Sequence, residues 1–293
     1  MRDRLDPMIA ERAPWLFQQT LTAKTAWLVL GRLLAYERSV EIGTTYLDRE
    51  VSEIMADLAY RIARQVTFDG LENVPTDGPA LIVANHPTGI ADGIILHDVL
   101  RQRRSDAFYY ANSDILRVLP QFEDMIVPVE WRPEKRTVTK TRETMKLTRE
   151  ALEAGRLGVI FPSGRLAKRR GLRLYERPWM ASAAMIARKF KLPVIPVHVR
   201  ARNSAMFYAF DALHPTLRDI TLFHETLNKD VQPFHITVGR PLDGAALPKD
   251  ANDGIEKLRD ATLRLANRRD GEISLTQTRP GRRWLPRPAG APS

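Results

Sequence analysis

From residue 66 onward, short apolar runs alternate with amphipathic stretches, and this alternation restricts the fold more than any other feature of the chain. The runs PALIVAN, LGVIFP and LPVIPVHV are apolar without regular polar alternation, which is typical of strands covered on both faces. Between these runs, apolar residues follow the spacing of a helix. For example, Val138, Met145 and Leu152 are seven residues apart. The sequence therefore predicts an α/β fold with a central, mostly parallel or mixed sheet flanked by helices.

The remaining segments complete this prediction. Further strands are expected in VTFDGLENVP, AFYYAN and MIVPVEW, and FHITVGRPL alternates in the manner of an edge strand. Further helices are expected at 91–104, 178–190 and 253–268. Residues 271–293 are rich in Pro, Gly and Arg, which predicts a flexible basic tail and places the main domain at 66–270.

Residues 1–65 predict a separate helical segment at the N-terminus. Its first part, WLFQQTLTAKTAWLVLGRLLAYERSVEIG, combines Trp15, Trp27 and several leucines with a polar side. Such a segment either packs on the rest of the fold or lies in a membrane interface. A second helix is expected in TYLDREVSEIMADLAYRIARQ, where Leu47, Val51 and Ile54 follow helical spacing.

The chain carries a formal net charge of +10, which calls for an acidic partner such as nucleic acid, an anionic membrane or a phosphorylated substrate. Nucleic acid is not expected, because the basic stretch LAKRRGLRLYER offers only Tyr175 for base stacking. The absence of cysteine excludes disulfides and thiolate catalysis. No apolar run reaches the roughly 18–20 residues of a spanning helix, and the charged first residues are unlike a signal peptide.

The stretch NHPTGIADG joins the first buried run to a predicted helix. In α/β proteins, turns at the carboxyl ends of strands open into a crevice where ligands bind. His86 is a candidate general base, and Asp92 can accept a bond from its far ring nitrogen and stabilise the charged imidazole. Gly89 shapes the tight turn, and Gly93 leaves room for close approach. The pattern also fits structural roles, with His86 bonding within a turn and Asp92 at a helix N-terminus.

No nucleophile for His86 to activate is evident in the sequence. Ser163 lacks the flanking glycines of a nucleophile elbow, because Phe161 and Arg165 stand in their places. Neither an HExxH motif nor a Walker loop occurs, and the other histidines lack metal-ligand spacing, so no metal site is expected. We therefore expect His86 to activate a hydroxyl or amine of the substrate in a direct group transfer.

Four stretches, in order, resemble the glycerolipid acyltransferase superfamily, which includes the lysophosphatidate acyltransferases. NHPTGIADG resembles the His–Asp block in the form of the hemolysin-like branch, which includes the acyltransferases of ornithine lipid synthesis. VIFPSGR is similar to the phosphate or headgroup block, RPWMASAAMIARKFKLPVIPV to the helix-and-strand block, and VRARNSAMFY to the G-R-N-S-x-x-F stretch. The resemblance covers residues 66 to about 245, and Ser163 stands where many members carry Glu.

The resemblance implies an acyltransferase domain at 66–270 that transfers an acyl group to a lysolipid, of lysophospholipid or lyso-ornithine lipid type. His86 would take the proton of the acceptor hydroxyl while Asp92 holds the imidazole. The freed oxygen would attack the thioester of acyl carrier protein or coenzyme A, and no cofactor is needed. Substrate contacts are expected from residues of the two motif blocks, namely Asn85, Gly89, Gly93, Ser163, Gly164 and Arg165.

A basic stretch beyond the second block is expected to receive the carrier protein, the donor's phosphates or the membrane surface, unless it is only a solvated loop. It contains Lys168, Arg169, Arg170 and Arg173. Because the acceptor is a lipid, we expect peripheral association with the cytoplasmic face of the cell membrane through the N-terminal helices and basic charge. The alternative function is a lipid-binding protein of the same fold that has lost its activity.

Overall fold

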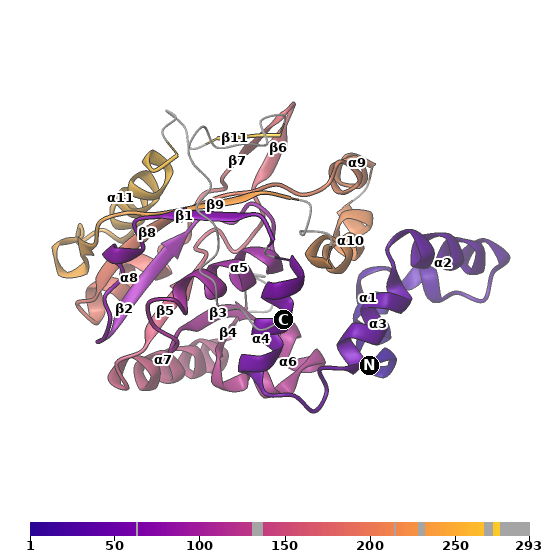
Figure 1. Ribbon diagram of the computed structural model, residues 1–293, viewed down its shortest axis with the longest axis horizontal. Helices are drawn as coiled ribbons and strands as arrows, with labels where there is room; N and C mark the ends of the chain where they lie inside the picture. The colour runs from indigo at the N-terminus through magenta and orange to yellow at the C-terminus, as the bar shows by residue number, and fades with distance from the viewer. Residues whose placement is uncertain (63, 131–136, 214, 228–231, 267–271, 276–293) are drawn as a thin grey trace.

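The computed structural model describes residues 1–62, 64–130, 137–213, 215–227, 232–266 and 272–275. Within them, an eight-stranded sheet has the order β1-β9-β8-β2-β5-β3-β4, with β10 paired to β8 (Figure 1). The strands are β1 Val66–Asp69, β2 Ala80–Ala84, β3 Phe108–Asn112, β4 Ile126–Val129, β5 Leu157–Ile160, β8 Pro193–Arg200, β9 Phe234–Val238 and β10 Leu242–Asp243. The five strands from β8 to β4 run parallel, whereas β9 runs antiparallel to β8. The predicted mostly parallel sheet flanked by helices is confirmed.

Helices cover both faces of this sheet. On one face lie α4 (Val51–Ile62) and α5 (Ile90–Leu100), and on the other lie α7 (Val138–Glu153), α8 (Ser182–Lys189) and α11 (Ala251–Arg264) (Figure 1). Successive side chains of a strand point to opposite faces. In β2, Ile82 therefore joins the core beneath α5, while Leu81 and Val83 join the core beneath α8.

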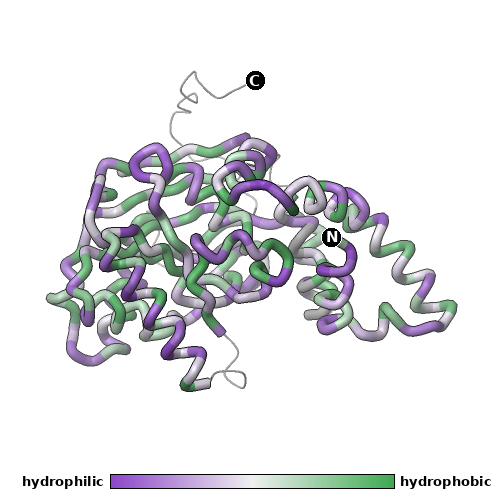
Figure 2. Tube along the Cα trace, turned by 90° about the horizontal axis from the view of Figure 1, so that it is seen from below, coloured by the Kyte–Doolittle hydropathy of each residue, from purple (hydrophilic) through white to green (hydrophobic). Residues whose placement is uncertain are grey.

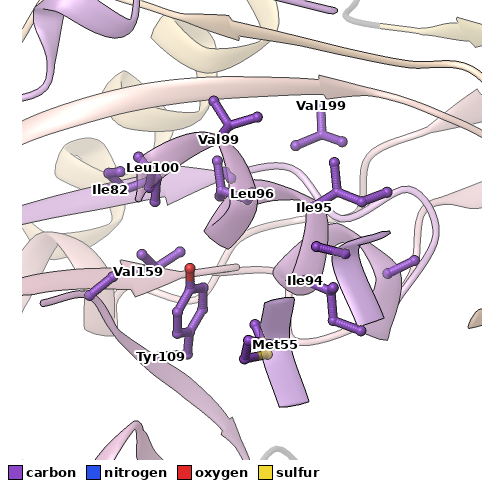
Figure 3. Packing of buried hydrophobic residues seen from close by; sticks show 14 of the residues in the cluster. Met55, Ile82, Ile94, Ile95, Leu96, Val99, Leu100, Tyr109, Val159 and Val199 are labelled. Carbon is purple, nitrogen blue, oxygen red and sulfur yellow. The ribbon is translucent and has the colours of Figure 1, made fainter. Parts of the chain in front are cut away.

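Helix α5 is buried on nearly all sides, which makes it a rigid support for the turn that precedes it. Ile95, Leu96 and Leu100 have no exposed surface, and they pack among residues of the sheet such as Ile82 and Val159 (Figure 3). A helix that is apolar all round needs such a surround. The position of its first turn is therefore determined by the core.

The N-terminal helices project from the sheet domain (Figure 1). They are α1 (Arg2–Arg12), the short 3₁₀ helix η1 (Pro14–Phe17), α2 (Leu21–Leu33) and α3 (Tyr36–Thr44). Leu5 and Met8 of α1 pack into the core beneath α5, whereas Leu21, Leu28 and Val29 of α2 are exposed. Figure 2 shows hydrophobic residues along the trace of these projecting helices. Across the described ranges, no helix combines the length and the apolarity needed to cross a membrane.

The prediction of an edge strand at FHITVGRPL is wrong. β9 lies inside the sheet, hydrogen-bonded to β1 on one side and to β8 on the other. Its alternation arises because Phe234, Ile236 and Val238 point into the core, while the side chains between them are only partly covered. Alternation of apolar and polar residues therefore indicates that one face of a strand is covered. It does not indicate whether the strand lies at an edge of the sheet.

Several elements were not predicted from the sequence. The basic stretch forms the strands β6 (Lys168–Arg170) and β7 (Arg173–Tyr175), and β11 (Ile273–Ser274) pairs with β7. The helices α6 (Asp114–Val118), α9 (Ala205–Leu213) and α10 (Pro215–Leu227) also lacked a clear sequence signal. Except for residues 272–275, the predicted tail at 271–293 lies outside the described residues.

Candidate active site

The imidazole of His86 lies beside the carboxylate of Asp92. His86 follows β2, and Asp92 is in the first turn of α5. The distance from Nδ1 of His86 to Oδ2 of Asp92 is 3.0 Å, but the oxygen lies away from the direction of an N–H bond. The two atoms are therefore in contact without forming an aligned hydrogen bond. Hydrogen bonds of catalytic residues commonly align only when substrate is bound.

The carboxylate of Asp92 is held in one position by the turn that precedes its helix. The side chain is completely buried, and Oδ2 accepts the backbone N–H groups of Thr88 at 2.8 Å and Gly89 at 3.0 Å. Oδ1 accepts the Thr88 hydroxyl at 2.5 Å. Gly89 has a φ of 97°, a conformation that favours glycine. The Asp therefore satisfies N–H groups that a helix N-terminus leaves without partners, and it has one orientation toward His86.

His86 is constrained on its other sides as well. Its ring stacks on Phe161 with a centroid distance of 4.4 Å, its backbone N–H donates to Glu176 at 3.2 Å, and its carbonyl accepts the N–H of Ala167 at 2.9 Å. The side chain keeps 20% of its surface exposed. Because Nδ1 faces Asp92, Nε2 is the ring nitrogen left for a ligand.

Glu176 is a buried member of this site that the sequence analysis missed. Oε1 accepts the indole N–H of Trp179 at 2.9 Å, and Oε2 accepts the backbone N–H of His86. Burial raises the pKa of Glu176, and hydrogen bonds from Trp179 and the His86 backbone offset part of that rise. The only local signal was the spacing of Glu and Trp in YERPW, which is typical of many structural contacts.

A cavity of about 1640 Å³ lies in front of His86. Gly89, Gly93, Gly164 and Arg165 also line it, as the sequence analysis expected of substrate-binding residues. A Cβ atom built on Gly93 would have no heavy atom within 4 Å, so the space in front of it is open. Most of the wall is apolar and comes from helices on both sides of the site, including Leu5, Met8, Leu30, Leu34, Ile94 and Phe122.

Two residues expected to contact substrate have structural contacts instead. The amide of Asn85 is buried, with Nδ2 donating to the carbonyl of Val199 at 2.9 Å and Oδ1 accepting its N–H at 2.7 Å. It therefore extends the pairing of β2 with β8. Ser163 is also buried, and its hydroxyl lies 2.8 Å from the carbonyl of Arg165, which shapes the turn that carries Arg165. Neither side chain lines the cavity.

The basic residues beyond the second block lie on the β6–β7 hairpin, outside the cavity wall. Lys168, Arg170 and Arg173 are exposed, and Arg173 pairs with Glu272 at 2.6 Å. The hairpin begins directly after Ala167, whose N–H binds the His86 carbonyl. Within the part of the chain that the structure describes, no three His, Asp or Glu side chains gather in a way that could hold a metal ion.

Comparison with known proteins agrees with the resemblance seen in the motifs. A family model described as Acyltransferase matches residues 65–200, which include His86, Asp92 and Arg165. This match supports the resemblance of the chain to the glycerolipid acyltransferase superfamily.

Two curated relatives carry the name lyso-glycine lipid O-acyltransferase. The protein of Phocaeicola vulgatus is 25% identical over 184 residues, which is 61% of this chain and 64% of the relative. That of Bacteroides thetaiotaomicron is also 25% identical over 184 residues, covering 61% of this chain and 66% of the relative. The match thus spans less than two thirds of either relative. The solved structure of the 1-acyl-sn-glycerophosphate acyltransferase PlsC from Thermotoga maritima aligns with a TM-score of 0.47 and 14% identity, covering 91% of this chain and 97% of that one.

Proposed function

We propose that this protein transfers a fatty acyl group from a thioester to the hydroxyl of a lysolipid. One observation carries the proposal: an imidazole, paired with a buried carboxylate, opens into a large and mostly apolar cavity. The match to the acyltransferase family model and the two lyso-glycine lipid O-acyltransferases among the relatives support the same chemistry. The acceptor is a lysolipid of amino-acid or glycerophosphate type.

In the proposed reaction, Nε2 of His86 removes the proton of the acceptor hydroxyl as its oxygen attacks the thioester carbonyl. Asp92 stabilises the imidazolium that forms. Collapse of the tetrahedral intermediate breaks the carbon–sulfur bond, and the imidazolium returns its proton to the thiolate. No acyl-enzyme and no prosthetic group take part. Asp92 already uses the N–H groups of Thr88 and Gly89, so donors to the oxyanion come from elsewhere in the first turn of α5.

The N-terminal helices give this site a path to lipid in our proposal. Leu30, Gly31 and Leu34 line the cavity, while Leu28 and Val29 of the same helix are 72% and 57% exposed. One element therefore has a face toward the cavity and a face toward the surroundings. An amphipathic helix of this kind binds a membrane interface reversibly, and basic charge adds attraction to anionic lipids. We propose peripheral association with the cytoplasmic face of the membrane.

The β6–β7 hairpin is the proposed contact for the donor. Its exposed cations and the exposed Leu172 at its turn fit an acidic carrier protein, and its base lies beside the His86 backbone. Acyl carrier protein is therefore the proposed donor carrier, and coenzyme A is the alternative.

The test is turnover by the purified protein with acyl carrier protein and coenzyme A thioesters against a panel of lysolipids. The panel contains lyso-glycine lipid, lyso-ornithine lipid and lysophosphatidate, and mass spectrometry identifies the diacyl product. We expect one acceptor to be turned over and His86→Ala to abolish the reaction while the far-ultraviolet circular dichroism is unchanged. Lipid binding without turnover for any donor would instead establish the inactive lipid-binding alternative.

A further inference from the structure

The β6–β7 hairpin binds the backbone of His86 at both of its ends. Ala167, directly before β6, donates its N–H to the carbonyl of His86 at 2.9 Å. Glu176, directly after β7, accepts the N–H of His86 through Oε2 at 3.2 Å. The peptide groups on both sides of the proposed base are therefore held by one segment that is distant in sequence.

The carboxylate of Glu176 is itself held in a definite place. Its side chain is buried, and Oε1 accepts the indole N–H of Trp179 at 2.9 Å. The next residue, Met180, donates its backbone N–H to the carbonyl of Pro162 in the turn after β5, at 2.9 Å. The Glu176 side chain thus connects the backbone of the base to a segment that is fixed on the sheet.

The two hydrogen bonds of Glu176 come from neutral donors, so a buried carboxylate here is costly to the fold. Burial raises the pKa of Glu176, and the bonds from Trp179 and His86 offset only part of that rise. An apolar side chain of similar size would avoid this cost. Groups of this kind are common at functional sites, where the cost is balanced by a role in the chemistry.

The alignment of His86 with Asp92 depends on the backbone that Glu176 holds. Nδ1 of His86 is 3.0 Å from Oδ2 of Asp92, but the oxygen lies off the direction of the N–H bond. Asp92 is held by the N–H groups of its own turn. Because only two torsion angles separate the imidazole from its Cα atom, a small shift of the His86 backbone changes this alignment.

We propose that Glu176 is a positioning residue for His86: its carboxylate holds the backbone of the base so that Nδ1 faces Asp92 and Nε2 faces the cavity. This inference rests on the proposed function and adds a residue that acts through the base. Glu176 is not among the residues that line the cavity. Its substitution should therefore lower kcat and leave the KM of donor and acceptor nearly unchanged.

The experiment compares Glu176→Gln with the matched control Glu225→Gln, both in the full chain. Glutamine has one acceptor oxygen, so at position 176 its NH₂ group must face the N–H of His86 or of Trp179. Glu225 on α10 is also buried, and it accepts the backbone N–H of Ser204 at 2.9 Å and its hydroxyl at 2.5 Å. We expect kcat to fall about tenfold in Glu176→Gln and to change by less than about a factor of two in Glu225→Gln. Urea unfolding verifies that both variants are folded.

Nitrogen-15 NMR of histidine-labelled protein tests the position of the base without turnover. The ring signals of His86 are assigned by their loss in His86→Ala. They should shift in Glu176→Gln, because the contact of Nδ1 with Asp92 changes, and stay in place in Glu225→Gln. Should Glu176→Gln not fold, Glu176→Asp takes its place; it keeps both acceptor oxygens on a side chain one methylene shorter, and the same changes should be smaller.

Three results would overturn the inference: His86 signals that do not move in Glu176→Gln, equal losses of kcat in the two glutamine variants, or a loss confined to KM. Failure of the proposed function gives a different result. A protein that turns over no acceptor, but whose His86 signals shift in Glu176→Gln alone, would refute the proposed reaction and retain the positioning role of Glu176.

Discussion

The turn that carries His86 and the N-terminal helices line one cavity, yet they are built in opposite ways. The turn is held by hydrogen bonds among buried groups: Asp92 is completely covered and accepts three bonds from Thr88 and Gly89. The helix α2 has few buried side chains and exposes Leu21, Leu28 and Val29. Polar groups are held in place at one end, and apolar groups are left uncovered at the other.

The difference shows how the two tasks of the proposed reaction are divided. Proton transfer needs groups placed within a few tenths of an ångström, and buried hydrogen bonds with a rigid helix behind them provide that. Contact with a lipid needs apolar surface that can be covered by something outside the chain, and the projecting helices provide that. Substitutions in the turn should therefore change kcat, whereas substitutions on α2 should change the partition to lipid.

The largest effect is expected at the base itself. His86→Ala should lower kcat by roughly 10² to 10⁴, because proton transfer from the acceptor hydroxyl loses its general base. The measurement is turnover of the best lysolipid acceptor, with circular dichroism to verify the fold. His224→Ala is the matched control, because this histidine also lines the cavity and should leave kcat within a factor of a few. Equal losses in both variants would contradict the assignment of the base.

Substitution of Asp92 tests whether this side chain both holds the turn in place and stabilises the charged imidazole of His86. Asp92→Asn should lower kcat by about 10², because the neutral amide stabilises the imidazolium less. It should also reduce the free energy of unfolding by about 1–3 kcal/mol, since the amide offers one acceptor oxygen to the three donors of Thr88 and Gly89 that the carboxylate accepts with two. Kinetics at saturating substrate and urea unfolding measure the two effects separately. A stability loss without a change in kcat would leave Asp92 with a structural role alone.

A substitution on the exposed face of α2 should change membrane binding and leave turnover nearly unchanged. Leu28→Glu should weaken binding to anionic vesicles about tenfold or more, because the transfer of one leucine side chain from water to lipid is lost. Turnover of an acceptor dispersed in detergent should change little. Co-sedimentation with vesicles measures the binding, and Val138→Glu on α7, which replaces a side chain that is 69% exposed, is the control. Equal loss of vesicle binding in both variants would contradict a membrane face on the N-terminal helices.

The smallest expected effect is the pH dependence of stability at Glu176. Because burial raises the pKa of Glu176, the folded protein holds a proton there more tightly than the unfolded chain does. The charged form therefore destabilises the fold, and this contribution develops as the pH rises from the usual carboxyl range through the raised pKa.

Urea unfolding at several pH values tests this point with the variant Glu176→Gln, whose amide cannot ionise. The free energy of unfolding of the unmodified protein should fall relative to that of the variant as the pH rises, by about 1.4 kcal/mol for each pH unit by which the pKa is raised. Glu143→Gln, on the exposed side of α7, is the control. A constant difference between the unmodified protein and Glu176→Gln at all pH values would contradict the raised pKa.

Some parts of this fold could be predicted from local patterns. The buried strands β2 and β5 are unbroken apolar runs, and β8 is apolar up to Val197. α7 has apolar residues at helical spacing, so its periodicity and its composition both indicate a helix. The β6–β7 hairpin has no strand signal in the sequence, because Lys168, Arg169 and Arg170 carry no apolar alternation. It forms strands through pairing with its own second arm and with β11, which is a contact distant in sequence. The edge assignment of β9 failed for a related reason, since strand order depends on partners that the strand itself does not encode.

The polar turn after a buried strand could be predicted from the sequence, with His86, Gly89 and Asp92 in one short stretch, because that chemistry is local to a few residues. Which other side chains join them depends on the packing of the whole fold. Glu176, Arg177 and Arg218 come from two distant segments, and each reaches the site through the packing of loops and helices around α5. Tertiary structure likewise gave Asn85 and Ser163 their structural contacts. The physical reason is that a side chain's partner depends on which strands and helices are neighbours, and that arrangement results from burying the whole core together.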